Sequence, residues 1–170
     1  MTKILQPITS TWLDYPNKDD CCLVVVMMDA RVAKVEDKLT KLVQKYAIDN
    51  ETKDYDVDSL IEELKMLCER HRTNKIVLSG GDPLSCFNIK FTKEFLEKAP
   101  FDVCIYTGHT IDYVKLHKVS GFKYLKCGMY LKNESQVSEK TDTYMQFASK
   151  NQKLFDSNYC CLSQNGLYYF

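Results

Sequence analysis

Two short turns in this sequence combine glycine with polar side chains that could bind a ligand. The first turn consists of Ser79, Gly80, Gly81, Asp82 and Pro83, and the second contains Thr107 and Gly108. Paired glycines let a backbone approach a ligand closely, and the carboxylate of Asp82 can accept hydrogen bonds from an ammonium group. The same residue types are also typical of a tight turn in which an aspartate caps a helix, so the turns alone do not establish a site.

Both turns follow short apolar segments that are typical of buried strands. These segments are residues 75–79 and 103–106, and an amphipathic helix that stops at Pro100 separates them. A further strand is expected within 122–129. The order strand, helix, strand predicts an α/β fold with a parallel sheet, in which ligands bind beyond the carboxyl ends of the strands. We therefore expect both turns to lie along one edge of the sheet.

The residues before the first turn are predicted to add strands and helices to this unit. The expected elements are two strands within 8–28 around the turn-rich stretch 15–20, a helix over 32–46, a surface loop over 49–56 and a helix over 57–72. Apolar residues at three- and four-residue spacing indicate both helices. Asp56 or Asp58 is expected to cap the second helix.

The residues after the last predicted strand of the sheet are mostly polar. Residues 132–143 are predicted to form a loop. The pair Asn165 and Gly166 is typical of a hairpin turn, so we expect a short terminal hairpin between 159–162 and 167–170. No repeat or internal linker interrupts the chain, and we predict a single domain over residues 1–170.

Composition restricts the classes of partner. The chain has 170 residues, and its 23 Lys and Arg balance its 23 Asp and Glu. Nucleic acid is therefore not the expected partner, because no overall positive charge attracts it. The longest apolar run, 21–28, is eight residues, whereas a membrane-spanning helix needs about 20. We expect no membrane association. The first residues lack the features of a signal peptide, so we expect a cytoplasmic protein.

The sequence has eight cysteines, but their spacing does not indicate a metal site. No C-x-x-C pattern occurs, and in a cytosolic protein reduced, mostly buried thiols are the expected state. The vicinal pairs at 21–22 and 160–161 could meet in space and bind a metal. Adjacent residues on a strand point to opposite faces, however, so one pair rarely supplies two ligands. We predict no metal-binding residues.

Several segments of the sequence resemble a known family. The stretch 77–84, with its G-G-D-P motif between a strand and a helix, resembles the small activating proteins of anaerobic ribonucleotide reductase, which are radical S-adenosylmethionine (SAM) enzymes. Further similarity lies at 103–108, with its T-G turn, at 126–133, where Cys127 replaces an aspartate of the family, and at 147–153. The last segment keeps Ser149, Asn151 and Gln152 but lacks an Arg-Gly pair.

The resemblance is collinear over nearly the whole chain, and it has consequences for fold and ligand. It implies a partial parallel (β/α) barrel of the radical SAM type. It also implies that SAM is the possible cofactor. The implied SAM-binding residues are Ser79, Gly80, Gly81, Asp82, Thr107, Gly108, Asn151 and Gln152.

The sequence departs from the family at the iron-sulfur motif. In the family a C-x-x-x-C-x-x-C loop after the first barrel strand holds a [4Fe-4S] cluster. The corresponding positions here are about Arg31, Val35 and Lys38, and no cysteine occurs between Cys22 and Cys68. These residues do not replace thiolate ligands. We therefore expect no iron-sulfur cluster, no radical SAM chemistry and no catalytic residue.

Three hypotheses about function remain. The preferred one is a cluster-less homologue of the activating protein that works by binding a protein partner, either a reductase-like subunit or a larger assembly. The alternative is a functional activator, or an enzyme that uses SAM without radical cleavage and holds it with the G-G-D-P turn. The third is a metalloenzyme that recruits cysteines of the vicinal pairs, which no spacing favours. His109 follows the T-G turn, and a hydrogen-bonding surface role is expected for it.

Overall fold

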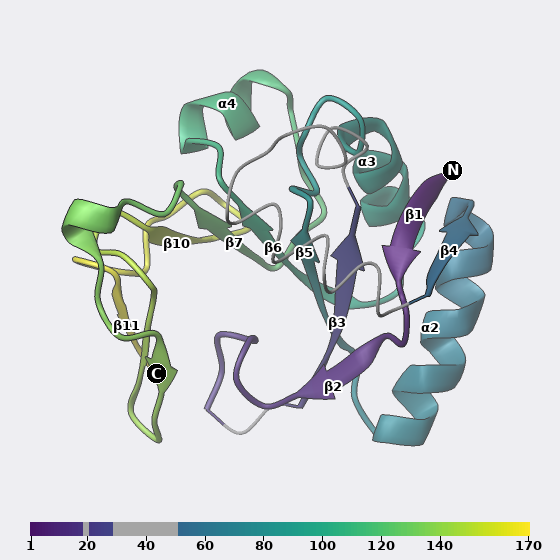
Figure 1. The fold of residues 1–170 in the computed structure, drawn as a ribbon, viewed down its shortest axis with the longest axis horizontal. Helices are drawn as coiled ribbons and strands as arrows, with labels where there is room; N and C mark the ends of the chain where they lie inside the picture. The colour runs from purple at the N-terminus through teal and green to yellow at the C-terminus, as the bar shows by residue number, and fades with distance from the viewer. Residues whose placement is uncertain (19–20, 29–50) are drawn as a thin grey trace.

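The computed structural model describes residues 1–18, 21–28 and 51–170, and within them the chain has a mixed α/β fold (Figure 1). Eight strands form one sheet in the order β10-β7-β6-β5-β3-β1-β4, with β2 also paired to β3. The strands are β1 (Thr2–Leu5), β2 (Thr9–Thr11), β3 (Cys22–Met27), β4 (Thr52–Tyr55), β5 (Lys75–Gly80), β6 (Asp102–Thr107), β7 (Tyr124–Cys127) and β10 (Lys153–Asp156).

The centre of this sheet is parallel and its borders are antiparallel. Strands β3, β5, β6 and β7 pair in parallel, as the alternation of strands and helices predicts. Strands β1, β2, β4 and β10 all pair in antiparallel fashion. In the described residues the sheet is open, with β10 and β4 at its edges. The expected barrel is therefore not confirmed, because the antiparallel border strands extend the sheet sideways instead of closing it.

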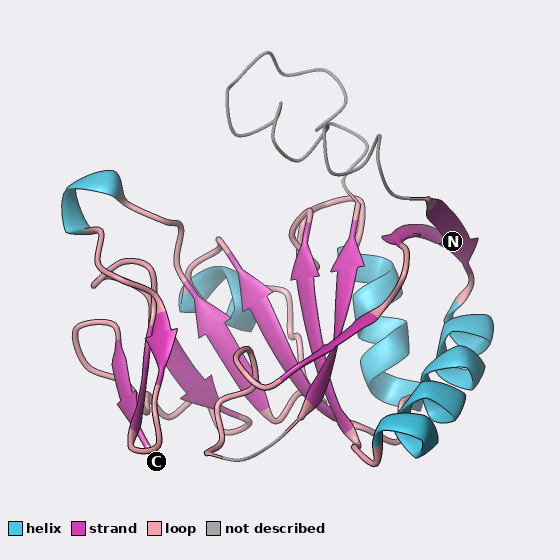
Figure 2. Ribbon diagram, turned by 60° about the horizontal axis from the view of Figure 1, so that its bottom comes forward, coloured by secondary structure: helices cyan, strands magenta, loops and turns pink. Residues whose placement is uncertain are grey.

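Among the described residues, three helices cover one face of the sheet (Figure 2). They are α2 (Val57–His71), α3 (Ile89–Lys98) and α4 (Ile111–Leu116). Apolar side chains from these helices and from alternate strand positions, such as Leu23, Ile76 and Ile105, form the main core. The side chain of Asp56 caps α2 by accepting a hydrogen bond from the backbone N of Ser59 at 2.8 Å, as predicted. We call this side of the sheet the helix face.

A second layer of short elements packs on the opposite face. It includes the segment around β2 and a small sheet of β8 (Glu139–Lys140), β9 (Tyr144–Gln146) and β11 (Leu167–Tyr169), preceded by the short helix η2 (Lys132–Glu134). Two small apolar clusters lie here. One contains Tyr15, Cys22, Val77 and Cys104, and the other contains Met145, Phe147 and Leu154. We call this side the open face.

One expectation about local structure is wrong, and one strand was not expected. The predicted loop over 49–56 contains the edge strand β4, which pairs with β1, a strand that the sequence pattern does not indicate either. Both strands have four residues, and β4 is mostly exposed, so neither has a clear apolar pattern. Their pairing joins segments about 50 residues apart in the chain, which short-range patterns do not detect.

The terminal hairpin is also only partly as predicted. Asn165 and Gly166 do form a tight turn with left-handed backbone, and Gln164 and Leu167 bond to each other across it. However, β11 then pairs with β9, and residues 159–162 form no strand. The carboxylate of Asp156 accepts hydrogen bonds from the backbone N atoms of Asn158 and Cys160, which turns this segment away from an extended path. The helix predicted over 32–46 and the positions Arg31, Val35 and Lys38 lie outside the described residues.

Among the residues that the structure describes, no helix has the length and apolar character that crossing a membrane requires.

Candidate functional site: the carboxyl edge of the parallel strands

Gly80, the last residue of β5, fits this strand tightly against β3. Gly80 has φ +88°, and a Cβ atom there would lie 2.6 Å from Val26 Cγ1 and 2.7 Å from the carbonyl O of Met27. The backbone N of Gly81 donates to that same carbonyl at 2.6 Å. A side chain at Gly80 would therefore collide with the neighbouring strand. The close approach that Gly80 permits is an approach to the neighbouring strand of the protein.

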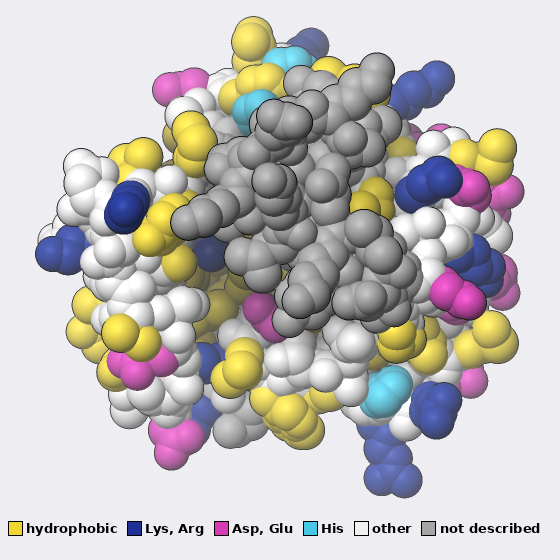
Figure 3. Space-filling view, viewed as in Figure 1, with side chains coloured by type: hydrophobic (Ala, Val, Ile, Leu, Met, Phe, Trp, Pro, Cys, Tyr) yellow, Lys and Arg dark blue, Asp and Glu magenta, His cyan; other side chains and the backbone are white. Residues whose placement is uncertain are grey.

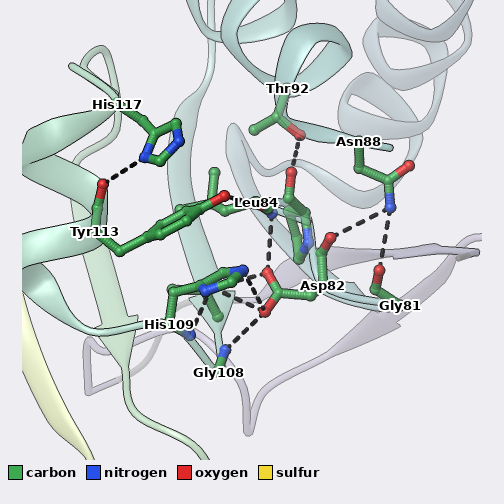
Figure 4. Close-up of polar contacts among 11 residues, drawn as sticks. Gly81, Asp82, Leu84, Asn88, Thr92, Gly108, His109, Tyr113 and His117 are labelled. Carbon is green, nitrogen blue, oxygen red and sulfur yellow. Dashed lines mark hydrogen bonds and ion pairs between the residues drawn. The ribbon is translucent and has the colours of Figure 1, made fainter. Parts of the chain in front are cut away.

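Asp82 connects the turn after β5 to the turn after β6 (Figure 4). Its Oδ1 accepts hydrogen bonds from Leu84 N at 2.9 Å and from Thr107 Oγ1 at 2.8 Å, and its Oδ2 accepts from Gly108 N at 2.9 Å. His109 Nε2 lies 3.9 Å from Oδ2. The side chain of Asp82 is 26% exposed. The carboxylate thus joins two loops that come from different strands.

Two residues that the sequence analysis missed support this turn: Asn88, the N-cap residue of α3, and Thr92 within that helix. Asn88 Nδ2 donates to the carbonyl oxygens of Gly81 and Asp82 at 3.1 and 3.2 Å, while its Oδ1 accepts from Thr2 Oγ1 at 2.9 Å. Thr92 Oγ1 donates to the carbonyl of Pro83 at 2.7 Å. Both side chains are buried. Their four-residue spacing on the inward side of the helix, among apolar residues, is a signal that could have revealed them.

A stack of three rings packs beside Asp82 (Figure 4). The ring centroids of His109 and Tyr113 lie 3.8 Å apart, and those of Tyr113 and His117 lie 4.0 Å apart. Tyr113 Oη donates to the carbonyl of Leu84 at 3.1 Å, so α4 is anchored to the same turn. His109 therefore lies near the predicted site, and its ring contributes to packing there.

Asn151 and Gln152 lie at the carboxyl end of the next strand, β7. Asn151 Nδ2 donates to the carbonyl of Met129 at 2.8 Å, and Gln152 Nε2 donates to that of Gly128 at 3.2 Å. The backbone N of Gly128 donates to the carbonyl of His109 at 3.1 Å, which links this group to the turn after β6. The two amides thus hold the chain as it leaves β7.

The eight predicted site residues therefore fall into three groups. Asp82, Thr107 and Gly108 are directly bonded, with Gly80 and Gly81 beside them. Asn151 and Gln152 form the second group, at β7. Ser79 differs, because it is two residues from Val77, which belongs to an open-face cluster, and so it points to the open face. The edge thus brings together most of the predicted residues, in contacts with one another.

The cysteines are all free thiols, and half of them are buried. Cys22, Cys68, Cys104 and Cys127 are buried, whereas Cys86, Cys160 and Cys161 are exposed. Burial raises the pKa of Cys22 and of Cys127 to about 12, with smaller contributions from Asp14 and Cys21 to the former and from Asp82 to the latter. These buried thiols pack as apolar groups. In the described residues, no three His, Cys, Asp or Glu side chains are placed to hold a metal ion.

A sizeable cleft lies at the amino-terminal ends of the parallel strands, opposite to the carboxyl edge. It has a volume of about 710 Å³ and is lined by Trp12, Arg72 and Lys75 among others, near the amino-terminal end of β5. None of the predicted site residues lines it.

Comparisons with protein-family models, with curated proteins and with solved structures find no match to this chain.

Proposed function

We propose that this protein is a cluster-less homologue of the activating proteins of anaerobic ribonucleotide reductase, with a partial radical SAM barrel as its ancestral fold. It works by binding a partner protein, a reductase-like subunit or a larger assembly. The observation that carries this proposal is the hydrogen bonding of Asp82. Its carboxylate already accepts from Leu84 N, Thr107 Oγ1 and Gly108 N, all within the chain.

These contacts let the G-G-D-P turn join the loops after β5 and β6 without a bound ligand. A carboxylate offers about four lone-pair positions, and three donors of the chain occupy most of them. The remaining direction on Oδ2 faces His109 Nε2 at 3.9 Å. An incoming ammonium group would compete with bonds that hold the β5 and β6 loops together. This arrangement favours a turn that supports a surface over a turn that binds SAM.

Exposed apolar side chains at the same edge are the features through which a partner would bind. Met129 and Tyr130 follow β7 directly and are 65% and 53% exposed. The backbone of Met129 is next to Gly108, since a Cβ atom on Gly108 would lie 3.9 Å from Met129 Cα. Large exposed aromatic and thioether side chains are common at the centres of protein interfaces.

The partner hypothesis is tested by cross-linking and purification of the tagged protein from its native host. We expect one protein to be recovered in stoichiometric amount with the wild type and to be lost, by roughly tenfold or more, with the double variant Met129→Glu, Tyr130→Glu. Met66→Glu is the matched control, because Met66 is also 65% exposed but lies on α2. Repeated recovery of the monomer alone, or equal recovery with all variants, would count against the proposal.

The second candidate function is SAM binding without radical cleavage. One observation favours it: the turns after β5 and β6 meet at the carboxyl edge, where ligands bind in parallel α/β sheets. Calorimetric titration with SAM tests it. We expect no binding. Saturable binding that Asp82→Asn removes, and that the exposed-site control Asp112→Asn retains, would instead support this second candidate.

A further inference from the structure

The cleft at the amino-terminal ends of the parallel strands is separate from the carboxyl edge. It has a volume of about 710 Å³, and its lining comes from the loop after β2, the carboxyl-terminal end of α2 and the start of β5. Clefts of this size are typical of sites that bind one small molecule. The sequence analysis assigned no ligand to this part of the chain.

Hydrogen bonds of Thr73 hold one wall of the cleft. Its Oγ1 donates to the carbonyl of Cys21, directly before β3, and its backbone N donates to the carbonyl of Cys68 at 3.0 Å, in the last turn of α2. The backbone N of Lys75 in turn donates to Thr73 Oγ1 at 3.1 Å. All four residues line the cleft. Because the segments of this wall are bonded to one another, the cleft is formed before a ligand binds.

Arg72 is the cation that this cleft offers to a ligand. It ends α2 with a left-handed backbone, φ +52°, and its exposed side chain lines the cleft. In the described part of the chain no carboxylate lies within 4.0 Å of its guanidinium, although Glu69 lines the same cleft. Lys75 differs, because its Nζ lies 3.2 Å from Asp102 Oδ2. A guanidinium presents a planar fork of N–H donors that matches a carboxylate.

Trp12 supplies an aromatic surface to the same cleft. It is the only tryptophan of the chain, and it is 63% exposed. Its loop is held in place, because Lys140 Nζ donates to the carbonyl of Trp12 at 2.8 Å and Leu13 N donates to Thr11 Oγ1 at 3.1 Å. Figure 3 shows basic side chains over the carboxyl-terminal end of α2 and apolar side chains beside them over the β2 segment. An exposed indole on a fixed loop offers a flat face on which a second ring can stack.

We propose that this cleft binds a small planar aromatic carboxylate. The carboxylate bonds to the guanidinium of Arg72, and the aromatic ring stacks on the indole of Trp12. This inference goes beyond the proposed function and does not depend on it. The cleft shares no residue with the carboxyl-edge turns or with the exposed pair Met129 and Tyr130, so partner binding and ligand binding can fail separately.

The single indole group gives a direct measurement of binding. The whole chain, labelled with nitrogen-15, is titrated with naphthoate, and the indole N–H signal of Trp12 is followed by NMR. We expect this signal to shift saturably with a Kd of about 1 mM or tighter, as for ligands of this size. No saturable shift would overturn the proposal.

A matched neutral ligand tests the charge of the cleft. Asp19 and Asp20 precede Cys21 in the chain and lie outside the described residues, so the anion is compared directly with an uncharged analogue. Naphthamide has the same rings without the charge, and we expect it to bind roughly tenfold more weakly than naphthoate. Equal or tighter binding of naphthamide would overturn the assignment of a carboxylate.

A pair of arginine variants assigns the contact. Arg72→Gln should weaken naphthoate binding by roughly fivefold or more and should leave naphthamide binding nearly unchanged. Arg70→Gln is the matched control, because Arg70 is also exposed at the end of α2 but does not line the cleft. An equal loss of naphthoate binding in the two variants would contradict the role of Arg72.

Protection of a thiol locates the ligand in the wild-type chain, without a variant. Cys21 is half-buried and lines the cleft, whereas Cys160 is exposed and does not line it. With naphthoate at about ten times its Kd, alkylation of Cys21 by iodoacetamide should slow roughly tenfold relative to Cys160. Peptide mass spectrometry measures both rates. Unchanged alkylation of Cys21 with naphthoate bound would place the ligand elsewhere and overturn the proposal.

Discussion

Two regions of this sheet, its carboxyl edge and its open face, hold their charged residues in different ways. At the carboxyl edge, Asp82 accepts three hydrogen bonds from two loops and is nearly saturated. On the open face, Lys126 contacts only rings at 4.5 and 5.1 Å among the interactions that the structure describes. The hydrogen bonds of Asp82 stabilise the fold, whereas the charge of Lys126 is partly buried and is balanced by weaker cation–π contacts with the rings. The carboxylate of the G-G-D-P turn is thus bonded to donors of the chain itself.

The largest expected effect is on Asp82. Asp82→Ala removes the acceptor of three hydrogen bonds to a charged group and leaves their donors unpaired, so we expect the free energy of unfolding to fall by about 2–4 kcal/mol. Urea denaturation measures this change. Asp112→Ala, an exposed aspartate on α4, is the matched control and should have little effect. An unchanged unfolding midpoint for Asp82→Ala would remove the structural role that we assign to this residue.

Removing the charge of Lys126 should change the free energy of unfolding in the opposite direction. Lys126→Met keeps most of the apolar stem of the side chain but removes the half-buried charge, so we expect the free energy of unfolding to rise by up to about 1 kcal/mol. The same denaturation experiment measures it. Lys123→Met, which breaks a contact with Asp102, should be neutral or slightly destabilising instead. If Lys126→Met lowered stability by as much as Asp82→Ala, the contrast between the carboxyl edge and the open face would fail.

A third charge, Asp102 at the start of β6, gives a smaller and pH-dependent effect. Although burial opposes it, hydrogen bonds from Lys123 and Lys75 lower the pKa of Asp102. The folded-state pKa is therefore below the unfolded value of about 3.9. The stabilisation is complete above that value and is lost as the pH falls through the folded-state pKa. Because the lysines are partly exposed, we expect under about 1 kcal/mol.

The pH effect is measured by thermal denaturation between pH 7 and pH 2. Asp102→Asn should lower the melting temperature near neutral pH and should converge with the wild type at low pH. Asp112→Asn serves as the control and should follow the wild type throughout. A constant offset between Asp102→Asn and wild type over the whole range would indicate a packing defect and contradict an electrostatic role.

The last prediction is that the protein binds no iron. After anaerobic reconstitution with iron and sulfide, we expect no bound iron and no charge-transfer band, because the sequence lacks the three cysteines of the cluster loop. Elemental analysis and absorption spectroscopy measure this. About four irons per chain would show that cysteines elsewhere build a cluster, and the activator role would then replace the binding role.

Much of the fold was predictable because its signals are local. The apolar run of β3, the strands β5, β6 and β7 and the helices α2 and α3 all follow from spacing that short stretches contain. Pairing between distant segments was not predictable from such spacing. Strands β1 and β4 are short, and β4 is polar and exposed, so only their contact with each other reveals them. The same holds for β11, which pairs with β9 rather than with the segment before its turn.

The candidate site divides in the same way. The sequence by itself determined that Gly80, Gly81, Asp82, Thr107 and Gly108 follow neighbouring parallel strands and so meet at one edge, because strand order and turn chemistry are local properties. The sequence also shows that no cysteine lies between Cys22 and Cys68, where the resembled family has its cluster loop. Only the tertiary structure decided that the carboxylate of Asp82 bonds to the chain itself. It alone placed Lys126 between two rings, since the partners of a charge come from segments distant in the sequence.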